Sequence, residues 1–296
     1  MMRKILSPSA TTACVLAAAA TLVAAAARAD SGWSQLNMTP GVTAMSRQIY
    51  GLHMLMFWLC VAIAAVVFGV MAYSIFTFRK SRGAVPDTTL VHSTRVEIVW
   101  TIVPVAILVV AAVPAATTLI KTEDLRNSQL TIKVTGYQWG WNYDYLNSNV
   151  SFFSRLDRAS DAARQLGSGV DVSTVPHYLL NVDKPLVVPV GVKVRVLVTA
   201  SDVIHSWWVP AFGVKKDAIP GFVNEAWFNI DADKPGLYRG NCAELCGRDH
   251  GFMPIVVDAR SQDDFATWLK AEQLAQHPAA SAESSAPAAS GPAPAR

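Results

Sequence analysis

The sequence predicts an α+β membrane protein in which a two-helix transmembrane hairpin is followed by an all-β sandwich or barrel. Two observations lead to this fold class. The chain of 296 residues is 52% hydrophobic, and before about residue 120 the apolar residues form two runs long enough to cross a bilayer. From about residue 127 the pattern changes to short alternating runs interrupted by Pro and Gly at turn positions, which is typical of strands.

The N-terminal segment has the features of a signal peptide. Arg3 and Lys4 give it a positive start, an alanine-rich apolar stretch follows, and residues 27–29 (Ala-Arg-Ala) form a small-x-small cleavage site. We therefore expect residues 1–29 to be removed from the mature chain. Residues 30–50 are then an external N-terminal segment in front of the first membrane span.

The transmembrane hairpin is predicted at residues 51–121. Its first apolar run covers residues 52–78 and its second covers residues 98–120, so each has about the 20 residues that a membrane helix needs. Pro104 and Pro114 lie within the second run, where neighbouring helices can re-satisfy the backbone groups that proline frees. The alternative is a pair of buried helices in a soluble protein.

Positive residues lie between the two predicted spans and are scarcer on the outer flanks. They are Arg79, Lys80, Arg82 and Arg95. By the positive-inside rule this connection is cytoplasmic, and a cleaved signal peptide predicts the same topology. We therefore expect a protein of the bacterial cytoplasmic (inner) membrane, with its N-terminus and its C-terminal domain on the periplasmic side.

The C-terminal domain is predicted at residues 122–272. The stretch LTIKVTGYQWGWNYDY alternates apolar and polar residues, and VKVRVLVTA repeats the pattern, so both are expected to be strands. On the first strand five aromatic residues would share one face: Tyr137, Trp139, Trp141, Tyr143 and Tyr145. A short helix is expected near residues 161–165. Residues 273–296, rich in Ala, Pro and Ser, are expected to form a low-complexity, disordered tail.

The stretch NCAELCGRDHGFMP concentrates metal-binding side chains in one loop. It contains Cys242, Cys246, His250 and Met253, and SDVIHSWWVP supplies His205 after a second strand. Thiolates and imidazoles favour copper, zinc or iron–sulfur centres, and a methionine thioether favours copper among these. The alternatives are a disulfide between the two cysteines, which an oxidising compartment permits, and a structural zinc site.

The second cysteine suggests more than a mononuclear site. A blue-copper centre takes one cysteine, two histidines and a weak methionine. Here Cys242 and Cys246 are both available. Because a thiolate can bridge two metal ions, the natural extension is a dinuclear copper centre that shares its electron between both ions.

Five motifs that follow one another along the chain resemble a known family. They are VEIVWTIVP, GYQWGWNY, DVIHSWWVP, DAIPG and CAELCGRDHGFMP. From about residue 45 to 270 the sequence is similar to subunit II of the haem-copper cytochrome c oxidases. The resemblance implies a transmembrane hairpin that carries an external cupredoxin-like sandwich with a dinuclear CuA centre. Quinol-oxidising relatives lack the metal motif.

The resemblance also implies a ligand set. The expected copper ligands are His205, Cys242, Glu244 through its backbone carbonyl, Cys246, His250 and Met253. The two cysteines would bridge both coppers and each histidine would bind one, while the methionine and the carbonyl would be weak axial ligands. The carboxylate of Glu244 would help to hold a magnesium ion shared with the catalytic subunit.

Further roles follow from the same resemblance. Trp139 would receive the electron from cytochrome c, and Glu97, at the cytoplasmic start of the second span, would mark the entrance of a proton path. The carboxylates that would attract cytochrome c are Asp144, Asp183 and Asp202. Two positions depart from the family pattern: Gly140 stands where an aromatic residue is frequent, and Phe222 where an arginine is common.

The resemblance predicts the electron-entry subunit of a respiratory cytochrome c oxidase, which passes electrons to haem for oxygen reduction coupled to proton pumping. The chain would not be active alone, and its partners would be the catalytic subunit I, other oxidase subunits, cytochrome c and the lipid bilayer. A net charge of only +3 gives no reason to expect a nucleic-acid partner. The alternatives are a membrane-anchored copper-delivery or assembly factor and the CuA subunit of a nitric oxide reductase.

Overall fold

The computed structural model of the chain describes residues 37–85, 88–89 and 92–277. The predicted signal peptide, the first part of the predicted external segment and the tail beyond residue 277 lie outside the described residues. All the elements discussed below belong to one compact unit that begins at Pro40.

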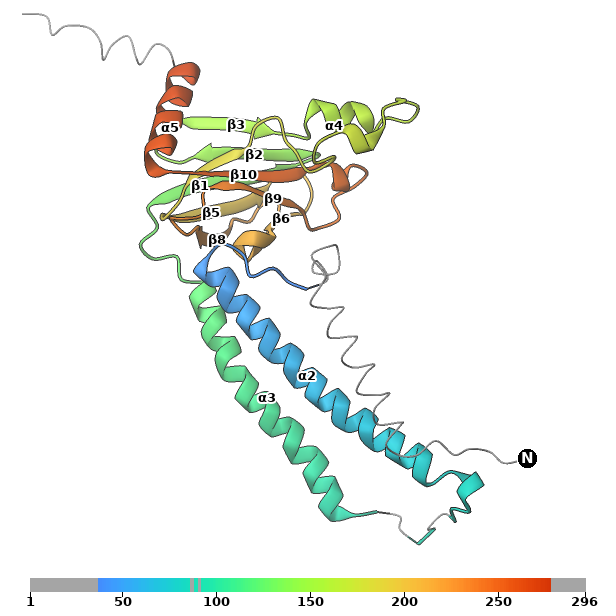
Figure 1. Cartoon of the computed structure of the whole chain (residues 1–296). Coiled ribbons are helices and arrows are strands. Elements are labelled where there is room, and N and C mark those ends of the chain that lie inside the picture. The colour runs from blue at the N-terminus through green and yellow to red at the C-terminus, as the bar shows by residue number, and fades with distance from the viewer. Residues whose placement is uncertain (1–36, 86–87, 90–91, 278–296) are drawn as a thin grey trace, which may run out of the picture. The chain divides into compact units, whose positions relative to one another are not determined.

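Two long helices, α2 (Ala44–Thr77) and α3 (Thr94–Thr122), form the hairpin (Figure 1). A capping box starts α2, because the Thr43 hydroxyl accepts a hydrogen bond from the Ser46 amide and the Ser46 hydroxyl accepts one from the Thr43 amide. Both helices are long and apolar enough to cross a membrane, and their most apolar windows are not buried inside the protein. Helices that are apolar all round need lipid or protein around them. The predicted spans are confirmed as helices, and the structure gives no support to a buried pair in a soluble protein.

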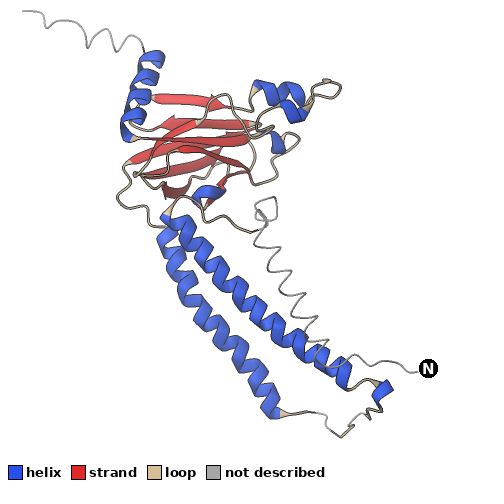
Figure 2. Cartoon of the chain, viewed as in Figure 1, coloured by secondary structure: helices blue, strands red, loops and turns tan. Residues whose placement is uncertain are grey.

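The C-terminal domain is a sandwich of two five-stranded sheets, with strand orders β3-β2-β1-β5-β8 and β4-β10-β9-β6-β7 (Figure 2). The first sheet contains β1 (Leu130–Tyr137), β2 (Gly140–Tyr145), β3 (Val150–Ser154), β5 (Lys193–Ala200) and β8 (Asn224–Asn229). The second contains β4 (Leu186–Pro189), β6 (His205–Val209), β7 (Val214–Ala218), β9 (Gly236–Cys242) and β10 (Pro254–Arg260). Short 3-10 helices are η2 (Lys80–Arg82), η3 (Val172–Thr174), η4 (Pro210–Phe212) and η5 (His250–Phe252). The predicted all-β sandwich is confirmed.

The alternating sequence patterns account for the core of the sandwich. On β1 the side chains of Ile132 and Val134 are fully buried, and so are those of Val194, Val196 and Val198 on β5. The two strands lie side by side in parallel. Each such aliphatic side chain contributes about 1.5–3 kcal/mol when it is removed from water, so the alternating pattern fixes which face of the sheet turns inward.

The aromatic stretch does not form the single strand that the sequence predicted. It is a hairpin in which Tyr137 of β1 pairs with Gly140 of β2, and residues 138–139 make the turn. Trp141, Tyr143 and Tyr145 share the buried face as predicted, whereas Tyr137 lies on the opposite face and Trp139 lies in the turn. The inward positions change from even to odd numbers between β1 and β2, which a chain reversal produces and an unbroken strand does not.

The segment between β3 and β4 carries helix α4 (Arg158–Ala163), which starts earlier than the predicted helix at residues 161–165. The carboxylate of Asp157 accepts a hydrogen bond from the Ser160 amide at 3.2 Å and so fixes the start of α4. We call residues 155–184 the inserted segment.

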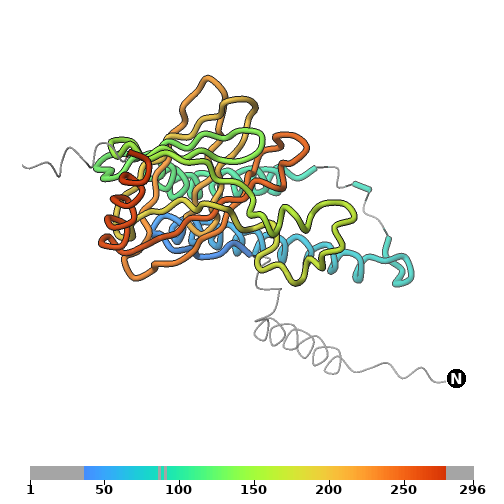
Figure 3. The backbone as a smooth tube through the Cα atoms, turned by 90° about the horizontal axis from the view of Figure 1, so that it is seen from above, coloured from blue at the N-terminus to red at the C-terminus, as the bar shows by residue number. Residues whose placement is uncertain are grey.

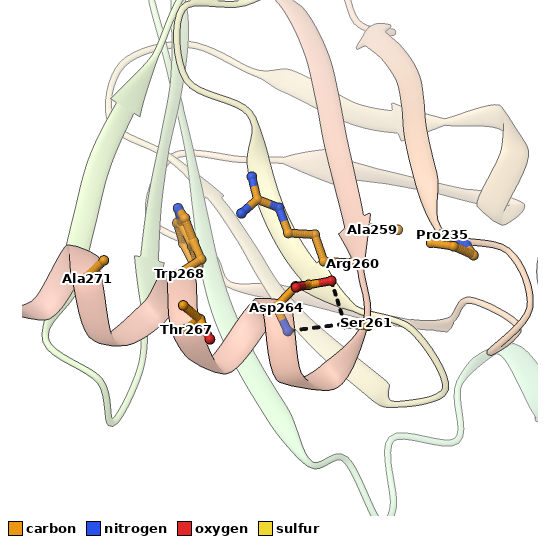
Figure 4. Close-up of a pocket in the computed structure, with 8 residues that line it drawn as sticks. All are labelled: Pro235, Ala259, Arg260, Ser261, Asp264, Thr267, Trp268 and Ala271. Atoms are coloured by element: carbon orange, nitrogen blue, oxygen red, sulfur yellow. Dashed lines mark hydrogen bonds between the residues drawn. The ribbon is translucent and has the colours of Figure 1, made fainter.

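A C-terminal helix, α5 (Gln262–Gln276), was not predicted, and it extends into the residues expected to be a disordered tail. Its first turn is capped by Ser261, whose hydroxyl accepts from the Asp264 amide at 3.1 Å (Figure 4). The apolar residues Phe265, Trp268 and Leu269 pack against the core at helical spacing. The helix contacts β3 and β4, which are edge strands of the two sheets. Figure 3 shows the helix, in red, along one side of the domain. It therefore covers exposed sheet edges that could otherwise pair with another chain.

Candidate metal centre

The cysteine motif forms a loop whose two ends are held together by the second sheet. Strand β9 ends at Cys242, β10 begins at Pro254, and the two strands pair in an antiparallel arrangement in which Pro254 faces Asn241. The residues between them include Cys246 and the 3-10 helix η5, which begins at His250. A loop closed in this way brings side chains from both of its ends to one place.

The sulfur and nitrogen atoms of the motif converge there. The Sγ atoms of Cys242 and Cys246 lie 3.9 Å apart, and Cys246 Sγ lies 3.5 Å from Nδ1 of His250 and 3.4 Å from Sδ of Met253. Nδ1 of His205 lies 4.0 Å from Cys242 Sγ. All five predicted side chains are therefore brought together, from β6, from the end of β9 and from the loop.

The donor set fits copper. Both cysteines are free, and 3.9 Å is far beyond the disulfide bond length of about 2.05 Å, so the disulfide alternative is not what the structure contains. The ligand atoms of His205, Cys242 and Cys246 lie within 4.8 Å of one another. At a metal–sulfur distance of about 2.3 Å, metal ions can be accommodated between the two sulfurs. The side chain of Met253 is 1% exposed, and a buried thioether beside two thiols favours copper over zinc.

The backbone carbonyl of Glu244 also lies beside the converging side chains, with its oxygen 3.3 Å from Cys242 Sγ. The side chain of Glu244 is exposed. Its carbonyl oxygen therefore lies at the metal loop and its side chain at the surface.

The surroundings of the two cysteines shift the pKa values of their thiols in opposite directions. Burial favours a high pKa for Cys242, but hydrogen bonds with His205, Ser206 and Glu244 outweigh it and lower the pKa to about 7. Burial, followed by the charge of Cys242, raises the pKa of Cys246 to about 12. A metal cation bound by both thiols would displace their protons, so metal uptake would be coupled to proton release.

His205 is fixed on both sides of its ring. Its side chain is fully buried, and Nε2 lies 2.9 Å from the carboxylate of Asp202, which turns Nδ1 toward Cys242. Burial lowers the pKa of this imidazole, but hydrogen bonds with Cys242 and Asp202 raise it above its ordinary value. On the other side, a Cβ atom added to Gly136 of β1 would lie 2.8 Å from Cδ2 of the ring. The sequence did not reveal this close approach.

Two tryptophans and a glutamine support the loop from the β1–β2 hairpin. Trp141 Nε1 donates to the carbonyl of Met253 at 3.3 Å, and its ring lies edge-on to His205. Gln138 Nε2 and Trp139 Nε1 both donate to the carbonyl of Cys246, at 2.9 and 3.2 Å. The predicted electron-receiving tryptophan thus contacts the metal loop directly. The exposed Arg248 guanidinium lies 5.5 Å from its ring centroid.

The two departures from the family pattern have different structural consequences. A Cβ atom at Gly140 would lie 2.5 Å from the Tyr137 hydroxyl, so the tyrosine fills the space that a side chain at position 140 would need. That hydroxyl accepts a hydrogen bond from Arg155 Nε at 2.8 Å. Phe222 is 67% exposed, so it presents an apolar ring to the surface.

The three predicted docking carboxylates are not gathered at one point. Asp202 accepts hydrogen bonds from the amides of Gln138 and Val203 besides facing His205. Asp183 accepts from the amides of Arg155 and Lys184, within the inserted segment. Asp144 pairs with the Ser151 hydroxyl on β3.

The position of Asp144 follows from the strand it occupies. Asp144 lies four positions after Gly140 on β2, which corresponds to about 13 Å along a strand. Glu97 lies in the first turn of α3, on the hairpin and not in the sandwich. The structure therefore brings only Asp202 of these four carboxylates into contact with the metal centre.

Comparisons with known proteins cover both parts of the chain. The family model described as the transmembrane domain of cytochrome c oxidase subunit II matches residues 31–117, and that of its periplasmic domain matches residues 130–260. The probable cytochrome c oxidase subunit 2 of Rickettsia prowazekii is 38% identical over 236 residues, which cover 79% of this chain and 71% of that protein.

Two further proteins illustrate the range of the similarity. Cytochrome c oxidase subunit 2 of Cereibacter sphaeroides is 35% identical over 276 residues, covering 88% of this chain and 90% of that protein. Among solved structures, the periplasmic domain of subunit II of cytochrome oxidase from Bradyrhizobium japonicum is 42% identical. It covers 50% of this chain and 96% of its own, with a TM-score of 0.43.

Proposed function

The chain belongs to the cytochrome c oxidase subunit II family, and from this premise we propose that it is the electron-entry subunit of a respiratory cytochrome c oxidase. It accepts electrons from reduced cytochrome c and passes them to haem in the catalytic subunit, where oxygen is reduced and protons are pumped. One observation carries this proposal: two thiols, two imidazoles and a thioether converge on a single place in a sandwich attached to two membrane helices.

Copper is the metal that this site is proposed to hold, as a dinuclear CuA centre. The proposed ligands are His205, Cys242, the carbonyl of Glu244, Cys246, His250 and Met253. When bound, the copper pair supplies a one-electron redox centre. The protein's contribution is to hold the donors still, since Asp202, Gly136 and Trp141 fix the rings and carbonyls around the site. A site that moves little on changing its charge exchanges electrons with little rearrangement.

The experiment that tests this function measures metal in the purified membrane complex that contains the chain. The expected result is two coppers per chain in this subunit and an electron paramagnetic resonance spectrum in which one unpaired electron is shared equally by two copper nuclei. A spectrum from one isolated copper would instead support the copper-delivery alternative. Oxygen consumption with reduced cytochrome c, and no reduction of nitric oxide at comparable rate, distinguishes an oxidase from a nitric oxide reductase.

We expect replacement of Trp139 with alanine to slow the oxidation of cytochrome c while the copper spectrum stays unchanged. The indole contacts the metal loop through Nε1, but the carbonyl of Cys246 keeps its hydrogen bond from Gln138, so the loop retains its support. Stopped-flow kinetics should show a rate at least about tenfold lower, equivalent to about 1.4 kcal/mol of barrier. Replacing Trp208, whose ring lies against Lys215, serves as the control. An unchanged rate in the Trp139 variant would remove this residue from the electron route.

Replacement of Asp202 with alanine separates two roles of this carboxylate. If it orients His205, as their 2.9 Å contact supports, copper affinity should fall by about 10- to 100-fold, because residues that orient a metal-binding histidine have effects of that size. If it only attracts cytochrome c, copper retention stays parental and the salt dependence of the electron-transfer rate changes. Asp144 is the matched control, since it pairs with the Ser151 hydroxyl on β3 and does not contact the metal centre. Titration with a copper chelator distinguishes the outcomes.

Two carboxylates are proposed to act toward the catalytic subunit. The exposed side chain of Glu244 supports a magnesium ion shared across the subunit boundary, and manganese resonance in the assembled complex tests this.

Glu97, in the first turn of α3, is proposed to mark the entrance of a proton path. Normal kinetics of haem reduction after Glu97→Gln would contradict that role.

The proposed location is the bacterial cytoplasmic (inner) membrane, with the sandwich on the periplasmic side. Arg79, Lys80, Arg82 and Arg95, between the two helices, support a cytoplasmic connection. The proposed partners are subunit I, further oxidase subunits, cytochrome c and the bilayer, without nucleic acid. Protease added to intact spheroplasts should cleave the sandwich and spare the connection, and the reverse pattern would contradict the topology.

A further inference from the structure

We propose that the inserted segment holds the His250 side of the metal centre in place, and that Arg164 is the positioning residue through which it acts. The proposal rests on the copper-binding function proposed above. It concerns a residue that belongs neither to the metal motif nor to the proposed electron route, and that lies far from both cysteines in the sequence.

The two histidines of the site differ in how firmly the fold holds them. His205 stands on β6, is fully buried and is confined between Gly136 and Asp202. His250 stands on the 3-10 helix η5 and is partly exposed, with Nδ1 3.5 Å from Cys246 Sγ. Fixing the second imidazole therefore depends on what holds η5.

Arg164, which directly follows α4, reaches η5 with two of its own contacts. Its Nη1 lies 3.6 Å from the carboxylate of Asp249, the residue before His250, and its guanidinium lies over the ring of Phe252 at 4.4 Å from the centroid. Its Nε also donates to Asp161 at 2.8 Å, which fixes the direction of the side chain. One guanidinium therefore contacts Asp249 before His250 and Phe252 after it.

The surroundings make these contacts stronger than ordinary surface contacts. The Asp249 side chain is only 14% exposed, and that of Arg164 is 22% exposed. Partial removal from water strengthens both the ion pair and the cation–π contact. Arg248 also approaches Asp249, at 3.3 Å, but its side chain is 81% exposed and belongs to the same loop. Outside the loop it approaches the Trp139 ring at 5.5 Å, a longer and more exposed contact than the 4.4 Å contact between Arg164 and Phe252.

The inserted segment is itself attached to the sandwich, so it can serve as a support. The Asp157 amide donates to the carbonyl of Asn181, and the buried Ser160 hydroxyl accepts from the Leu179 amide, which closes the segment on itself. Arg239 of β9 donates to the side chain of Asn181 at 3.1 Å. This strand leads directly to Cys242. The segment that carries Arg164 is therefore bonded to the strand that ends at the first cysteine.

A guanidinium is specifically suited to this position. Its planar face stacks on Phe252 while its edge meets two carboxylates, a combination that the compact ammonium of lysine cannot reproduce. Arg164, Asp249 and Phe252 also line one hollow of about 320 Å³ together with Gln138 and Trp139. The contacts of Arg164 with η5 and the hairpin turn that supports Cys246 therefore lie on the same side of the metal loop.

The test compares Arg164→Ala, Arg164→Lys and Phe252→Leu with Arg158→Ala in the purified complex. Arg158 begins α4 and is exposed, so replacing it is a matched loss of one cation from the inserted segment. We expect Arg164→Ala to lose copper to a chelator about tenfold faster than the parent and to show unequal hyperfine coupling to the two coppers. Arg164→Lys and Phe252→Leu should be intermediate, and Arg158→Ala should match the parent.

Each outcome decides one question. Parental copper loss and parental hyperfine coupling in Arg164→Ala would overturn the inference while leaving the proposed function intact. If the parent itself holds no copper pair, the proposed function fails, and this result is distinct from the first. If Arg164→Ala does not assemble, the two milder variants decide, because the inference requires both to differ from Arg158→Ala in the same direction.

Discussion

Replacing Cys246 with serine is expected to abolish the copper pair and, with it, electron transfer from cytochrome c. The thiol of Cys246 contacts the other cysteine, His250 and Met253, so it connects one half of the site to the other. A serine hydroxyl is a poor copper ligand compared with a thiolate. Residues that only orient a ligand contribute about 10- to 100-fold to metal affinity, so the loss of a shared ligand should cost more than about 100-fold.

The measurement is the copper content of the purified complex together with its resonance spectrum and its oxidation of cytochrome c. Cys60→Ser is the matched control, since this exposed cysteine lies on α2 and outside the metal loop. It should keep two coppers and the parental rate. Retention of both coppers with equal hyperfine coupling in Cys246→Ser would show that the two cysteines do not share the metal ions, and the dinuclear proposal would then be wrong.

The sequence was sufficient to predict which side chains converge at the candidate metal centre, because cysteine, histidine and methionine are themselves metal-binding side chains. Four of the five side chains lie in one loop, and cysteine, histidine and methionine at such short spacing are typical of a metal site that contains copper. The hairpin was equally accessible, since an apolar run of sufficient length needs no tertiary information. His205 is distant in sequence from the loop, and it was found because it follows a strongly alternating strand.

The supporting parts of the site could not be predicted in the same way. Gly136 and Asp202 act on His205 through contacts between β1, β6 and the turn before β6. The sequence of a single strand does not specify which strand of the other sheet packs against it. Asp202 was predicted to be a docking charge, and that prediction did not include the contact between its carboxylate and the imidazole. Arg164 carried no signal at all in the sequence, because an arginine beside a short helix is ordinarily a solvated charge.

Two errors in the predicted fold had signals that were present in the sequence. The change of inward positions from even to odd numbers before Trp141 indicates the reversal between β1 and β2. Ser261 with Asp264 three residues later is a helix start, and Phe265, Trp268 and Leu269 follow at helical spacing, which together indicate α5. The prediction missed the reversal because it continued the alternating pattern through residues 138–139. It missed α5 because it used the change of composition near residue 273 and not the helical spacing before it.

Replacing Gly136 with alanine is expected to displace His205 and weaken the copper site, although the substitution adds only one methyl group. The new Cβ would lie 2.8, 2.9 and 3.1 Å from three atoms of the His205 side chain, closer than carbon atoms approach without strain. The ring cannot retreat, because it is fully buried and Asp202 holds its far side. Inserting a methyl group into a packed interior costs about 1–3 kcal/mol, and here the strain falls on a proposed copper ligand.

Gly251→Ala is the control that isolates this cause. Gly251 follows His250 directly in the metal loop, yet a Cβ atom there would meet nothing within 4 Å, so this variant should retain copper as the parent does. Gly136→Ala should lose copper to a chelator at least about tenfold faster and shift the hyperfine coupling of the His205 copper. Faster copper loss in Gly251→Ala than in Gly136→Ala would contradict this prediction, because it would show that closeness in sequence to His250 matters more than the contact with His205. The structure predicts the opposite order, because the glycine distant in sequence is the one pressed against the imidazole.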